Sequence, residues 1–596
     1  MAFKQIGILR TAFVVFAALA LAATASAQPR EAVVATANPH ASEAAAEMLR
    51  RGGTAADAAI AAELVLGLVE PQSSGLGGGG FLLHFNGATR AIDAYDGREI
   101  APAGATPTMF LNAEGAPMGF MEAVTSGRSI GAPSLVAMLK LAHDAHGRLP
   151  WRVLFEPAIK LADEGFAVSP RLNRLITMAI ARGGLTVDPA ARAYLTDADG
   201  APLAVGAVLK NPAYAETLRE LSRNPRALAG GRLARAIVNA AHADPIPGAL
   251  TYSDLRRVKP RRLSPVCGPF RRYLVCSMPP PSSGGVAVIE LLGLYARAAV
   301  VPEDKDDAED WSAFLWASRL AYADRDFYVA DDRFVPVPTR QLLARDYLDQ
   351  RFREIDLARA PRGVAPGDPG RATGGLPLID MWGRDTTNEA PGTTHMSIMD
   401  HAGNVVALTA TVESVFGSQR MAAGFFLNNQ LTDFSFRPEI NGKPVANAVA
   451  PGKAPRSSMA PTIILTPDGN FYAAIGSPGG SAIIAYVART IVGFTDWGLS
   501  MQDAIDVGHI IAAGPVARRE ARRVPAPLVR TLASRGWSLR ESEAEDSGLH
   551  GLRVTSNGVE GGADPRREGV VIRVPPPVPA ATLPAPLPDA AAAPTR

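Results

Sequence analysis

The chain has little cysteine, no excess of charge of either sign and, beyond its first residues, no long uncharged hydrophobic run. Only Cys267 and Cys276 occur among 596 residues, too few for a disulfide scaffold and without the spacing of a zinc site. The 60 Lys and Arg side chains balance 58 Asp and Glu side chains, which argues against binding to nucleic acid or to an anionic membrane surface. These absences favour a protein that works on small molecules without a metal.

The first 27 residues have the pattern of a secretory signal peptide. Lys4 and Arg10 give a positive start, residues 12–22 form an apolar run, and Ala25-Ser26-Ala27 is a small-residue cleavage site. The run is too short to span a bilayer, and no cysteine follows the cleavage site to carry a lipid. We therefore predict a signal peptide at 1–27 and export to a bacterial periplasm or beyond, with no membrane association after its removal.

The two cysteines flank the short sequence PFRRY, which is typical of the tip of a β-hairpin from Ser264 to Met278. In an oxidising compartment a cross-strand disulfide between Cys267 and Cys276 is expected. Two free buried thiols remain the alternative. The last residues, 574–596, are rich in Pro and Ala and are predicted to form a disordered tail.

Two short motifs suggest other chemistries. Gly75, Gly77 and Gly80 match the dinucleotide fingerprint G-x-G-x-x-G, but a helix precedes them and a strand (81–85) follows, the reverse of a Rossmann site. Residues 127–131, GRSIG, match the nucleophile elbow G-x-S-x-G and are followed by a predicted helix. Neither the βαβ alternation nor the HGGG-type segment of a serine hydrolase accompanies this second motif.

The stretch from Pro391 to Thr411 is the strongest candidate for a catalytic site. Residues 396–399 and 405–411 alternate as strands around a turn at 401–404, and Gly392-Thr393 stands immediately before them. If the chain is cut between these two residues, Thr393 carries both a hydroxyl nucleophile and an α-amine to act as its base. The preceding residues 355–392 show little periodicity, as expected of an exposed segment that is accessible for cutting. By itself, a Thr-Thr pair at the start of a strand is more commonly a structural part of the strand than a catalytic site.

Ten stretches in order resemble one family. They are NPHASEAAAEMLRRGG, EPQSSGLGGGGF, DGREIAPA, SMPPPSSGG, YADRDFY, TTHMSIMD, LNNQLTDF, PRSSMAPTI, GSPGG and GGADPRREG. Together they are similar to the γ-glutamyltransferase (γ-glutamyltranspeptidase, glutathione hydrolase) family of N-terminal-nucleophile hydrolases. The resemblance implies an α/β (α+β) fold, an αββα four-layer sandwich. It also implies self-cleavage into a large subunit, 28–392, and a small subunit, 393–596, that remain together as a heterodimer.

The resemblance also assigns catalytic roles. Cleavage would fall between Gly392 and Thr393, Thr393 would be the nucleophile, and Thr411 would form a hydrogen bond with it. Gly479 and Gly480 would supply backbone N–H groups to the oxyanion.

The family pattern further implies how a γ-glutamyl group is held. Arg98, Ser457 and Ser458 would bind its α-carboxylate, and Asp433 with Gln430 would bind its α-ammonium, since each pairing matches opposite charges or complementary donors. From the residues alone, a surface ion pair between Arg98 and Glu99 is the simpler interpretation of DGRE.

Two features depart from the family. Glu413 stands where many members have an asparagine near the substrate, so it either strengthens ammonium binding or repels the carboxylate. The segment between Asp433 and Ser457 is shorter than a full lid and its residues 435–456 contain no tyrosine. A short lid would leave the acyl-enzyme open to water.

The resulting hypothesis is a cofactor-free enzyme whose Thr393 attacks the γ-amide of glutathione-like donors. The acyl group would pass to water or to an amino acid or dipeptide acceptor. One alternative is an acylase of the same fold for glutaryl-type side chains such as those of cephalosporins. The other, of a different class, is a catalytically inactive, uncleaved periplasmic binding protein.

Overall fold

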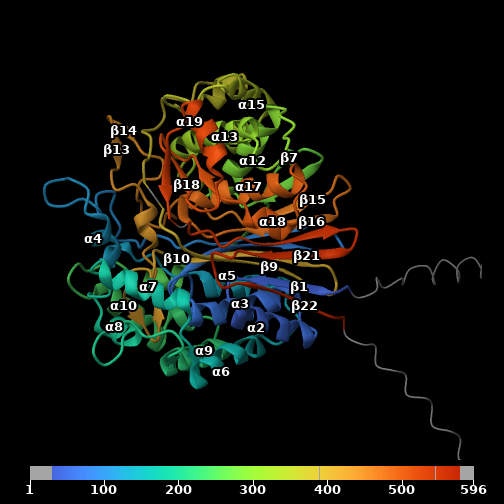
Figure 1. Cartoon of the computed structure of the whole chain (residues 1–596). Coiled ribbons are helices and arrows are strands. Elements are labelled where there is room, and N and C mark those ends of the chain that lie inside the picture. The colour runs from blue at the N-terminus through green and yellow to red at the C-terminus, as the bar shows by residue number, and fades with distance from the viewer. Residues whose placement is uncertain (1–29, 388, 544, 577–596) are drawn as a thin grey trace, which may run out of the picture.

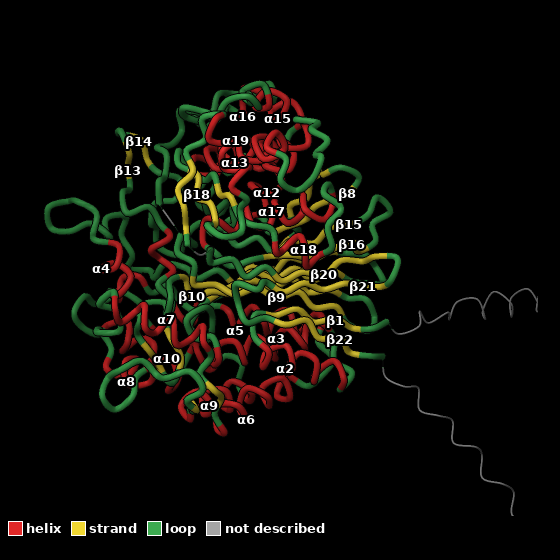
Figure 2. Tube along the Cα trace, in the orientation of Figure 1, coloured by secondary structure: helices red, strands yellow, loops and turns green. Residues whose placement is uncertain are grey.

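Two β-sheets lie face to face between two layers of helices (Figure 1). The computed structural model describes residues 30–576 except 388 and 544, so the predicted signal peptide lies outside the described residues. Figure 2 shows the strands as one band through the middle of the molecule, with helices above and below it. The expected αββα sandwich is confirmed.

The first sheet has seven strands and contains the candidate nucleophile in its centre. In spatial order they are β22 (Val570–Val574), β1 (Ala32–Thr36), β9 (Gly392–Met399), β10 (Val405–Glu413), β2 (Gly79–Phe85), β3 (Ile92–Gly97) and β6 (Arg261–Leu263). β9 and β10 pair antiparallel, with Thr393 opposite Thr411, as the alternating pattern of this stretch predicts.

The second sheet has six strands. In spatial order they are β21 (Gly558–Ala563), β20 (His550–Thr555), β16 (Phe471–Gly476), β15 (Thr462–Leu465), β8 (Tyr273–Ser277) and β7 (Val266–Phe270). Smaller sheets pair β4 (Phe166–Ala167) with β5 (Val208–Leu209), β11 (Met421–Ala422) with β12 (Phe425–Phe426), β13 (Glu439–Ile440) with β14 (Lys443–Pro444), and join β17 (Ile510–Ile511), β18 (Ala517–Glu520) and β19 (Leu539–Ser542).

The helices divide between the two outer faces. Against the first sheet lie α2 (Pro39–Arg50), α3 (Ala55–Val69), α5 (Leu135–His146), α6 (Glu156–Glu164), α7 (Pro170–Ala181), α8 (Pro189–Leu195), α9 (Pro212–Arg223), α10 (Gly231–His242) and α11 (Tyr252–Arg257). Against the second lie α12 (Gly284–Arg297), α13 (Ala308–Tyr328), α15 (Arg345–Phe352), α17 (Ile483–Thr495), α18 (Met501–Asp506) and α19 (Ala526–Ser534). The short elements are α4 (Phe120–Thr125), α14 (Thr339–Leu342), α16 (Pro369–Ala372), η1 (Gly127–Ser129), η2 (Trp151–Phe155), η3 (Ala227–Ala229), η4 (Gln430–Asp433) and η5 (Gly480–Ala482).

Side-chain alternation in the first sheet explains why it is covered on both faces. Leu82 of β2 and Val406 of β10 contribute to the core shared with the first helix layer, whereas Leu83 and Ala407 contribute to the core between the sheets. Successive side chains of a strand point to opposite faces, so strands covered on both faces are apolar throughout. β9 and β10 are buried at every position, which places the candidate nucleophile deep in the fold.

The first two helices begin at capping residues. The Asn38 side chain accepts the His40 N–H and Pro39 is the first residue of α2, while Thr54 and Asp57 form a reciprocal capping box at the start of α3. Near the C-terminus, helix α18 ends at Asp506. Gly508 lies against Arg523, and a Cβ there would be 2.6 Å from the Arg523 carbonyl carbon, so the chain turns away.

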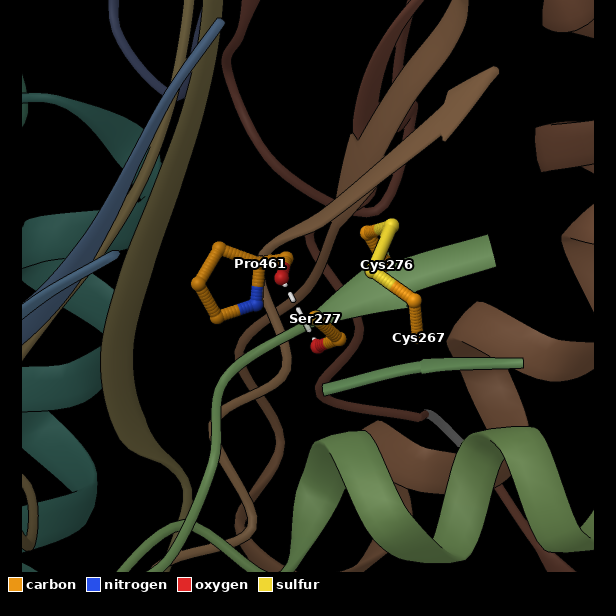
Figure 3. Close-up of a disulfide and its surroundings, with 4 residues drawn as sticks. All are labelled: Cys267, Cys276, Ser277 and Pro461. Atoms are coloured by element: carbon orange, nitrogen blue, oxygen red, sulfur yellow. Dashed lines mark hydrogen bonds between the residues drawn. A yellow bond between two sulfur atoms is a disulfide. The ribbon is translucent and has the colours of Figure 1, made fainter. Parts of the chain in front are cut away.

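The hairpin around the two cysteines forms from β7 and β8, with Cys267 directly opposite Cys276. In the structure a disulfide joins the two sulfurs (Figure 3). The Ser277 hydroxyl donates to the Pro461 carbonyl at 2.8 Å, which connects this hairpin to the beginning of β15. The edge of the second sheet is thereby linked both covalently and by a hydrogen bond.

The predicted disordered tail begins too early at 574. Val574 is 1% exposed and ends strand β22, pairing with Ala32 of β1. The apolar run preceding the prolines extends the sheet by one edge strand, and residues 577–596 lie outside the described part. Within that part, every helix is too short or too polar to cross a membrane.

Candidate active site

Thr393 lies at the beginning of β9, and its hydroxyl faces Thr411 on the neighbouring strand. The two hydroxyl oxygens are 3.1 Å apart. Thr411 donates its own proton to the Gly392 carbonyl at 2.7 Å and accepts the Glu413 N–H at 2.8 Å. Since a hydroxyl has a single proton, the Thr393 hydroxyl donates to Thr411. The peptide carbonyl before Thr393 is therefore hydrogen-bonded by the same group that accepts the Thr393 proton.

The peptide bond between Gly392 and Thr393 is buried, contrary to the expectation of an exposed cleavage segment. Much of 356–384 is exposed or half-buried, but Gly392 and Thr393 are buried within the strand pair. A Cβ at Gly392 would lie 2.4 Å from the carbonyl oxygens of Glu413 and Ser414. Only glycine fits there, because the sheet closes over the bond.

Glu413 occupies a strained position beside the nucleophile. Its φ is +82°, a value that non-glycine residues rarely adopt, and the β9–β10 register shifts between Thr411 and Glu413. The bulge directs the carboxylate back toward the cleavage segment, where Oε1 accepts the Ala390 N–H at 2.8 Å. Glu413 therefore contacts both strands of the candidate site.

Arg98, Asp433 and Gln430 form a buried polar cluster. Arg98 Nη2 lies 2.5 Å from Asp433 Oδ2, and Gln430 donates to the same oxygen at 2.7 Å. Arg98 also donates to the carbonyls of Pro455 and Arg456, which fixes its guanidinium against the segment leading to Ser457. Gln430 Oε1 and Asp433 Oδ1 are buried without an N–H or hydroxyl donor among the described residues, and the Glu413 carboxyl is in hydrogen-bonding contact with Asp433.

The two acidic residues next to each other have raised pKa values. Burial, and then the negative charge of Asp433, raise the pKa of Glu413 well above its usual range. Burial raises the pKa of Asp433 to about 6, although Arg98 opposes that change. The two carboxyls are in contact, so a charge on one opposes ionisation of the other, and Arg98 favours the charge on Asp433.

The structure places the two predicted serines beside this cluster but gives them different partners. Ser458 accepts from Arg325 Nη2 at 2.6 Å and its N–H donates to Glu389 Oε2 at 2.8 Å. The same Arg325 nitrogen binds the other Glu389 oxygen. Ser457 instead uses its hydroxyl to accept the Met459 N–H at 3.2 Å. In the uncut chain a carboxylate thus already lies at Ser458, and it belongs to Glu389.

The glycine pair at 479–480 forms the turn that opens η5. Gly479 and Gly480 have φ values of +131° and +57°, which favour glycine. A Cβ on Gly480 would lie 2.2 Å from the Glu389 carbonyl oxygen, so this turn touches the cleavage segment directly. The structure therefore brings the predicted oxyanion donors to the chain just before Thr393.

Three charged residues near the site were not assigned a role from the sequence. Arg567 donates to the Thr393 carbonyl at 3.0 Å and is buried, and Arg325 and Glu389 form the ion pair at Ser458. YADRDFY and GGADPRREG contain both arginines among the family-like stretches, which was the available signal. The contacts themselves join positions 64 and 174 residues apart, so sequence spacing gives no indication of them.

The two competing local interpretations are wrong. Ser129 of GRSIG lies buried in η1 and donates to the carbonyls of Val124 and Ser126, so it forms part of a turn before α5. Arg98 is not in a surface pair with Glu99: it is 5% exposed and pairs with Asp433. Glu99 is itself buried, and burial raises its pKa to about 8.

A cavity of about 450 Å³ adjoins the cleavage segment. Thr386, Thr387, Glu389 and Ala390 line one part of it, and Phe436 lies in another part together with residues of the short lid-like segment. That segment forms the small hairpin of β13 and β14. A space of this size suits a small peptide-like ligand.

One group of residues has the composition of a metal site. Among the described residues, His84, Asp93 and His146 bring three ligand atoms within 4.8 Å of one another. The two imidazole rings are stacked, however, with centroids 3.6 Å apart and planes 7° from parallel, so their nitrogen lone pairs do not converge. Asp93 is also paired with Arg262 at 2.8 Å. This arrangement does not fit a bound ion.

The four-layer fold, with a threonine at the beginning of a central strand, is that of an N-terminal-nucleophile hydrolase. A family model described as Gamma-glutamyltranspeptidase matches residues 41–574. The Glutathione hydrolase proenzyme of Bacillus subtilis (strain 168) is 33% identical over 550 residues, covering 91% of this chain and 92% of that protein. The chain belongs to the γ-glutamyltranspeptidase family and is an enzyme of that family.

Acylases are also among its relatives. The Acylase ACY 1 proenzyme of Pseudomonas sp. (strain SE83) is 30% identical over 542 residues, covering 89% of this chain and 91% of that protein. A crystal structure of cephalosporin acylase from Bacillus halodurans superposes with a TM-score of 0.77 at 24% identity, covering 91% of this chain and 96% of that one. The latter likeness concerns the fold, and the choice between the two acyl groups depends on the site.

Proposed function

We propose that the chain cuts itself between Gly392 and Thr393 and then transfers γ-glutamyl groups from glutathione-like donors to water or to amines. The products of the cut would be a large subunit, 28–392, and a small subunit, 393–596, held together by the sheets they share. β9 and β10 of the small subunit lie between β1 and β2 of the large one, so separation would expose the centre of the first sheet. No cofactor takes part in the proposed reaction.

The cut follows from the hydrogen bonds at Thr393. Its hydroxyl oxygen attacks the Gly392 carbonyl carbon and passes its proton to Thr411, 3.1 Å away, while Thr411 gives its own proton to the Gly392 carbonyl oxygen. The C–N bond then breaks as the carbonyl re-forms, the proton moves from that oxygen to the nitrogen, which becomes the α-amine of Thr393, and Gly392 is left as an ester on the threonine oxygen. Water then hydrolyses the ester to a free Gly392 carboxylate. The hydrogen bond from Thr411 to the Gly392 carbonyl favours the first attack by polarising that carbonyl.

In the cut enzyme the same threonine oxygen would attack the γ-carbonyl of the donor, with its own α-amine as general base. The leaving amine departs with a proton, and the γ-glutamyl group remains as an ester on Thr393. The N–H groups of Gly479 and Gly480 are proposed to stabilise the oxyanion. An acceptor amine or water completes the turnover and restores the hydroxyl.

The observation that supports a γ-glutamyl donor is the buried acidic and amide cluster beside Arg98, in which Asp433 contacts Glu413 and Gln430 Oε1 accepts no hydrogen bond from a described residue. A buried polar atom without a partner needs an explanation, and a bound ligand that donates to it is one. An α-ammonium supplies three donors, and the adjacent guanidinium suits an α-carboxylate. Glu413 connects this cluster to the strand of Thr393 through the Thr411 hydroxyl.

A glutaryl donor is the second candidate, because relatives named as acylases share the fold and the threonine-centred layout. A glutaryl group has no ammonium to donate to Asp433 Oδ1 or Gln430 Oε1. The site as built therefore favours the γ-glutamyl group.

We also propose export of the protein, on the basis of residues 1–27 alone. The relatives' names contain no information on the compartment, so this proposal depends on the charge and hydrophobic pattern of the leader.

Purified protein tests the processing step. Two chains should appear on a denaturing gel, and N-terminal sequencing of the smaller should begin at Thr393. Thr393→Ala should remain one chain because it lacks the attacking oxygen, and Thr393→Ser should be cut slowly. Cleavage of the alanine variant at this bond would refute self-cleavage by Thr393.

Turnover of a γ-glutamyl anilide tests the donor. Intact-mass measurement during turnover should show a γ-glutamyl adduct on the small chain only. An adduct on the large chain, or turnover by Thr393→Ala, would contradict the assignment of the nucleophile.

A further inference from the structure

A second cavity, of about 190 Å³, reaches the same Arg98 by a different route. Its lining includes Asp96, Ser134 and Arg98, and of these only Arg98 belongs to the candidate active site. It is formed by the end of β3, the chain from α11 to β6, and the loop after α13. The proposed reaction does not use this cavity.

Five of the residues lining this cavity are cationic and one is acidic. The cations are Arg98, Arg257, Lys259, Arg261 and Arg333. The acid, Asp96, accepts from Arg261 at 2.9 and 2.6 Å, so those two charges compensate each other. The cavity is therefore positive overall.

The remaining positive charge is not fully used by the protein. Arg333 binds Asp331. Arg257 and Lys259 are exposed and make no ion pair or side-chain hydrogen bond with any described residue. Arg98 is buried and uses Nε and Nη2 for its partners, whereas its Nη1 donates to no described residue. The same small cavity is therefore lined by two cations without partners among the described residues, Arg257 and Lys259, and by Arg98 with its unused Nη1.

We propose that this cavity binds a small oxyanion, with Arg257 and Lys259 at its mouth and Arg98 at its inner end. Charge-assisted hydrogen bonds from guanidinium and ammonium groups suit the oxygens of such an anion. Drug-sized ligands occupy sites of about 300–1,000 Å³, so a space of about 190 Å³ selects a small anion.

The site would also be coupled to the donor, a consequence that rests on the proposed function. The same Arg98 guanidinium would face the donor's α-carboxylate on one side and the oxyanion on the other. Two anions on one cation repel each other and share its donors. Each ligand should therefore weaken the other by the same factor, since coupling between two sites is reciprocal.

Calorimetric titration with inorganic phosphate tests the site directly, with chloride at matched ionic strength as the control for screening. The double variant Arg257→Ala/Lys259→Ala should bind phosphate at least about tenfold more weakly than the unmodified enzyme. Arg256→Ala is the matched control: Arg256 is also exposed on α11 but does not line this cavity, only the neighbouring one that shares Lys259 with it, so phosphate binding should not change. Absence of phosphate binding by the unmodified enzyme, or equal binding by the double variant, would overturn the proposal.

Kinetics with a γ-glutamyl anilide test the coupling. Saturating phosphate should raise KM at least about fivefold, a factor at the low end of typical site-to-site coupling, and leave kcat unchanged. The double variant should lose this effect. An unchanged KM in the unmodified enzyme would refute the coupling. Failure of the proposed function would appear differently, as absence of γ-glutamyl turnover with phosphate binding intact.

Discussion

Asp433 offers the sharpest test of the donor, because it separates the γ-glutamyl group from the glutaryl group. The two acyl groups differ only at the α-carbon, where glutaryl lacks the ammonium but keeps the carboxylate. In the structure Asp433 Oδ2 is used by Arg98 and Gln430, and Oδ1 has no N–H donor among the described residues, while the Glu413 carboxyl contacts Asp433. Comparing a γ-glutamyl anilide with the corresponding glutaryl anilide removes the ammonium without altering the enzyme.

The size of the expected preference follows from burial. A hydrogen bond to a charged group contributes about 1.5–3 kcal/mol, and a buried acceptor left without a partner costs about 1–3 kcal/mol. Their sum, roughly 4 kcal/mol, corresponds to about a thousandfold in kcat/KM at 1.36 kcal/mol per factor of ten. We therefore expect kcat/KM for the γ-glutamyl anilide to exceed that for the glutaryl anilide by about this factor.

Both anilides are assayed by release of the chromogenic amine, in the unmodified enzyme and in Asp433→Asn. The variant should narrow the gap mainly by slowing the γ-glutamyl substrate, since the glutaryl group never used the lost charge. Asp199→Asn, at an exposed turn, controls for a general effect of removing a carboxylate. Because the pKa of Asp433 is about 6, kcat/KM for the γ-glutamyl substrate should also fall as the pH drops through 6. Comparable rates on both anilides in the unmodified enzyme would refute the role of Asp433 and favour the acylase.

Two further changes test the surroundings of Thr393, and a third tests the disulfide. Glu413→Gln should stabilise the folded protein more at pH 7.5 than at pH 4.5. Folding raises the pKa of the Glu413 carboxyl, so this side chain destabilises the folded state once the pH exceeds the ordinary pKa of a glutamate, and glutamine removes that penalty. Urea unfolding of uncut Thr393→Ala protein, with and without the Glu413 change, measures the difference at the two pH values. Arg567→Met should slow processing while Arg567→Lys partly restores it, because the Thr393 carbonyl loses its donor; a time course on gels, with thermal melting to exclude unfolding, decides. Cys267→Ser should reduce the unfolding free energy by roughly 2–3 kcal/mol on the chain-entropy account of a bridge across nine residues, and an equal loss in fully reduced unmodified protein would exclude a packing effect.

The strands and helix starts around the site were predictable because their causes are local. The alternation of residues 396–411 and a turn at 401–404 are sufficient to specify the β9–β10 hairpin, which aligns Thr393 with Thr411. The caps at Asn38 and Thr54 likewise involve side chains within three residues of the backbone that they satisfy. Such features need no knowledge of the tertiary fold.

The environment of the cleaved bond was not predictable in this way. A segment rich in Gly, Pro and polar residues is ordinarily exposed, yet its last residue enters the centre of a seven-stranded sheet. Its burial depends on β1, which lies about 360 positions earlier in the chain and pairs with β9 on the other side. The contacts of Arg98 with Asp433 and of Ser458 with Arg325 were likewise not predictable. Each joins two segments that only the complete sandwich brings together.

The contacts of Glu389 connect processing to substrate binding. In the uncut chain its carboxylate holds the Ser458 N–H and Arg325, and it lies four residues before Thr393. A donor carboxylate needs a similar set of donors, and two carboxylates cannot share them in a buried space without a large electrostatic penalty. While the 392–393 bond is intact, the strand pairing of Gly392 with Glu413 keeps Glu389 near these donors. If Ser458 receives the donor carboxylate as proposed, cutting that bond would make Gly392 a chain end and would let Glu389 leave. The same peptide bond would then conceal the α-amine of Thr393 and retain the carboxylate at Ser458, and one cleavage would release both.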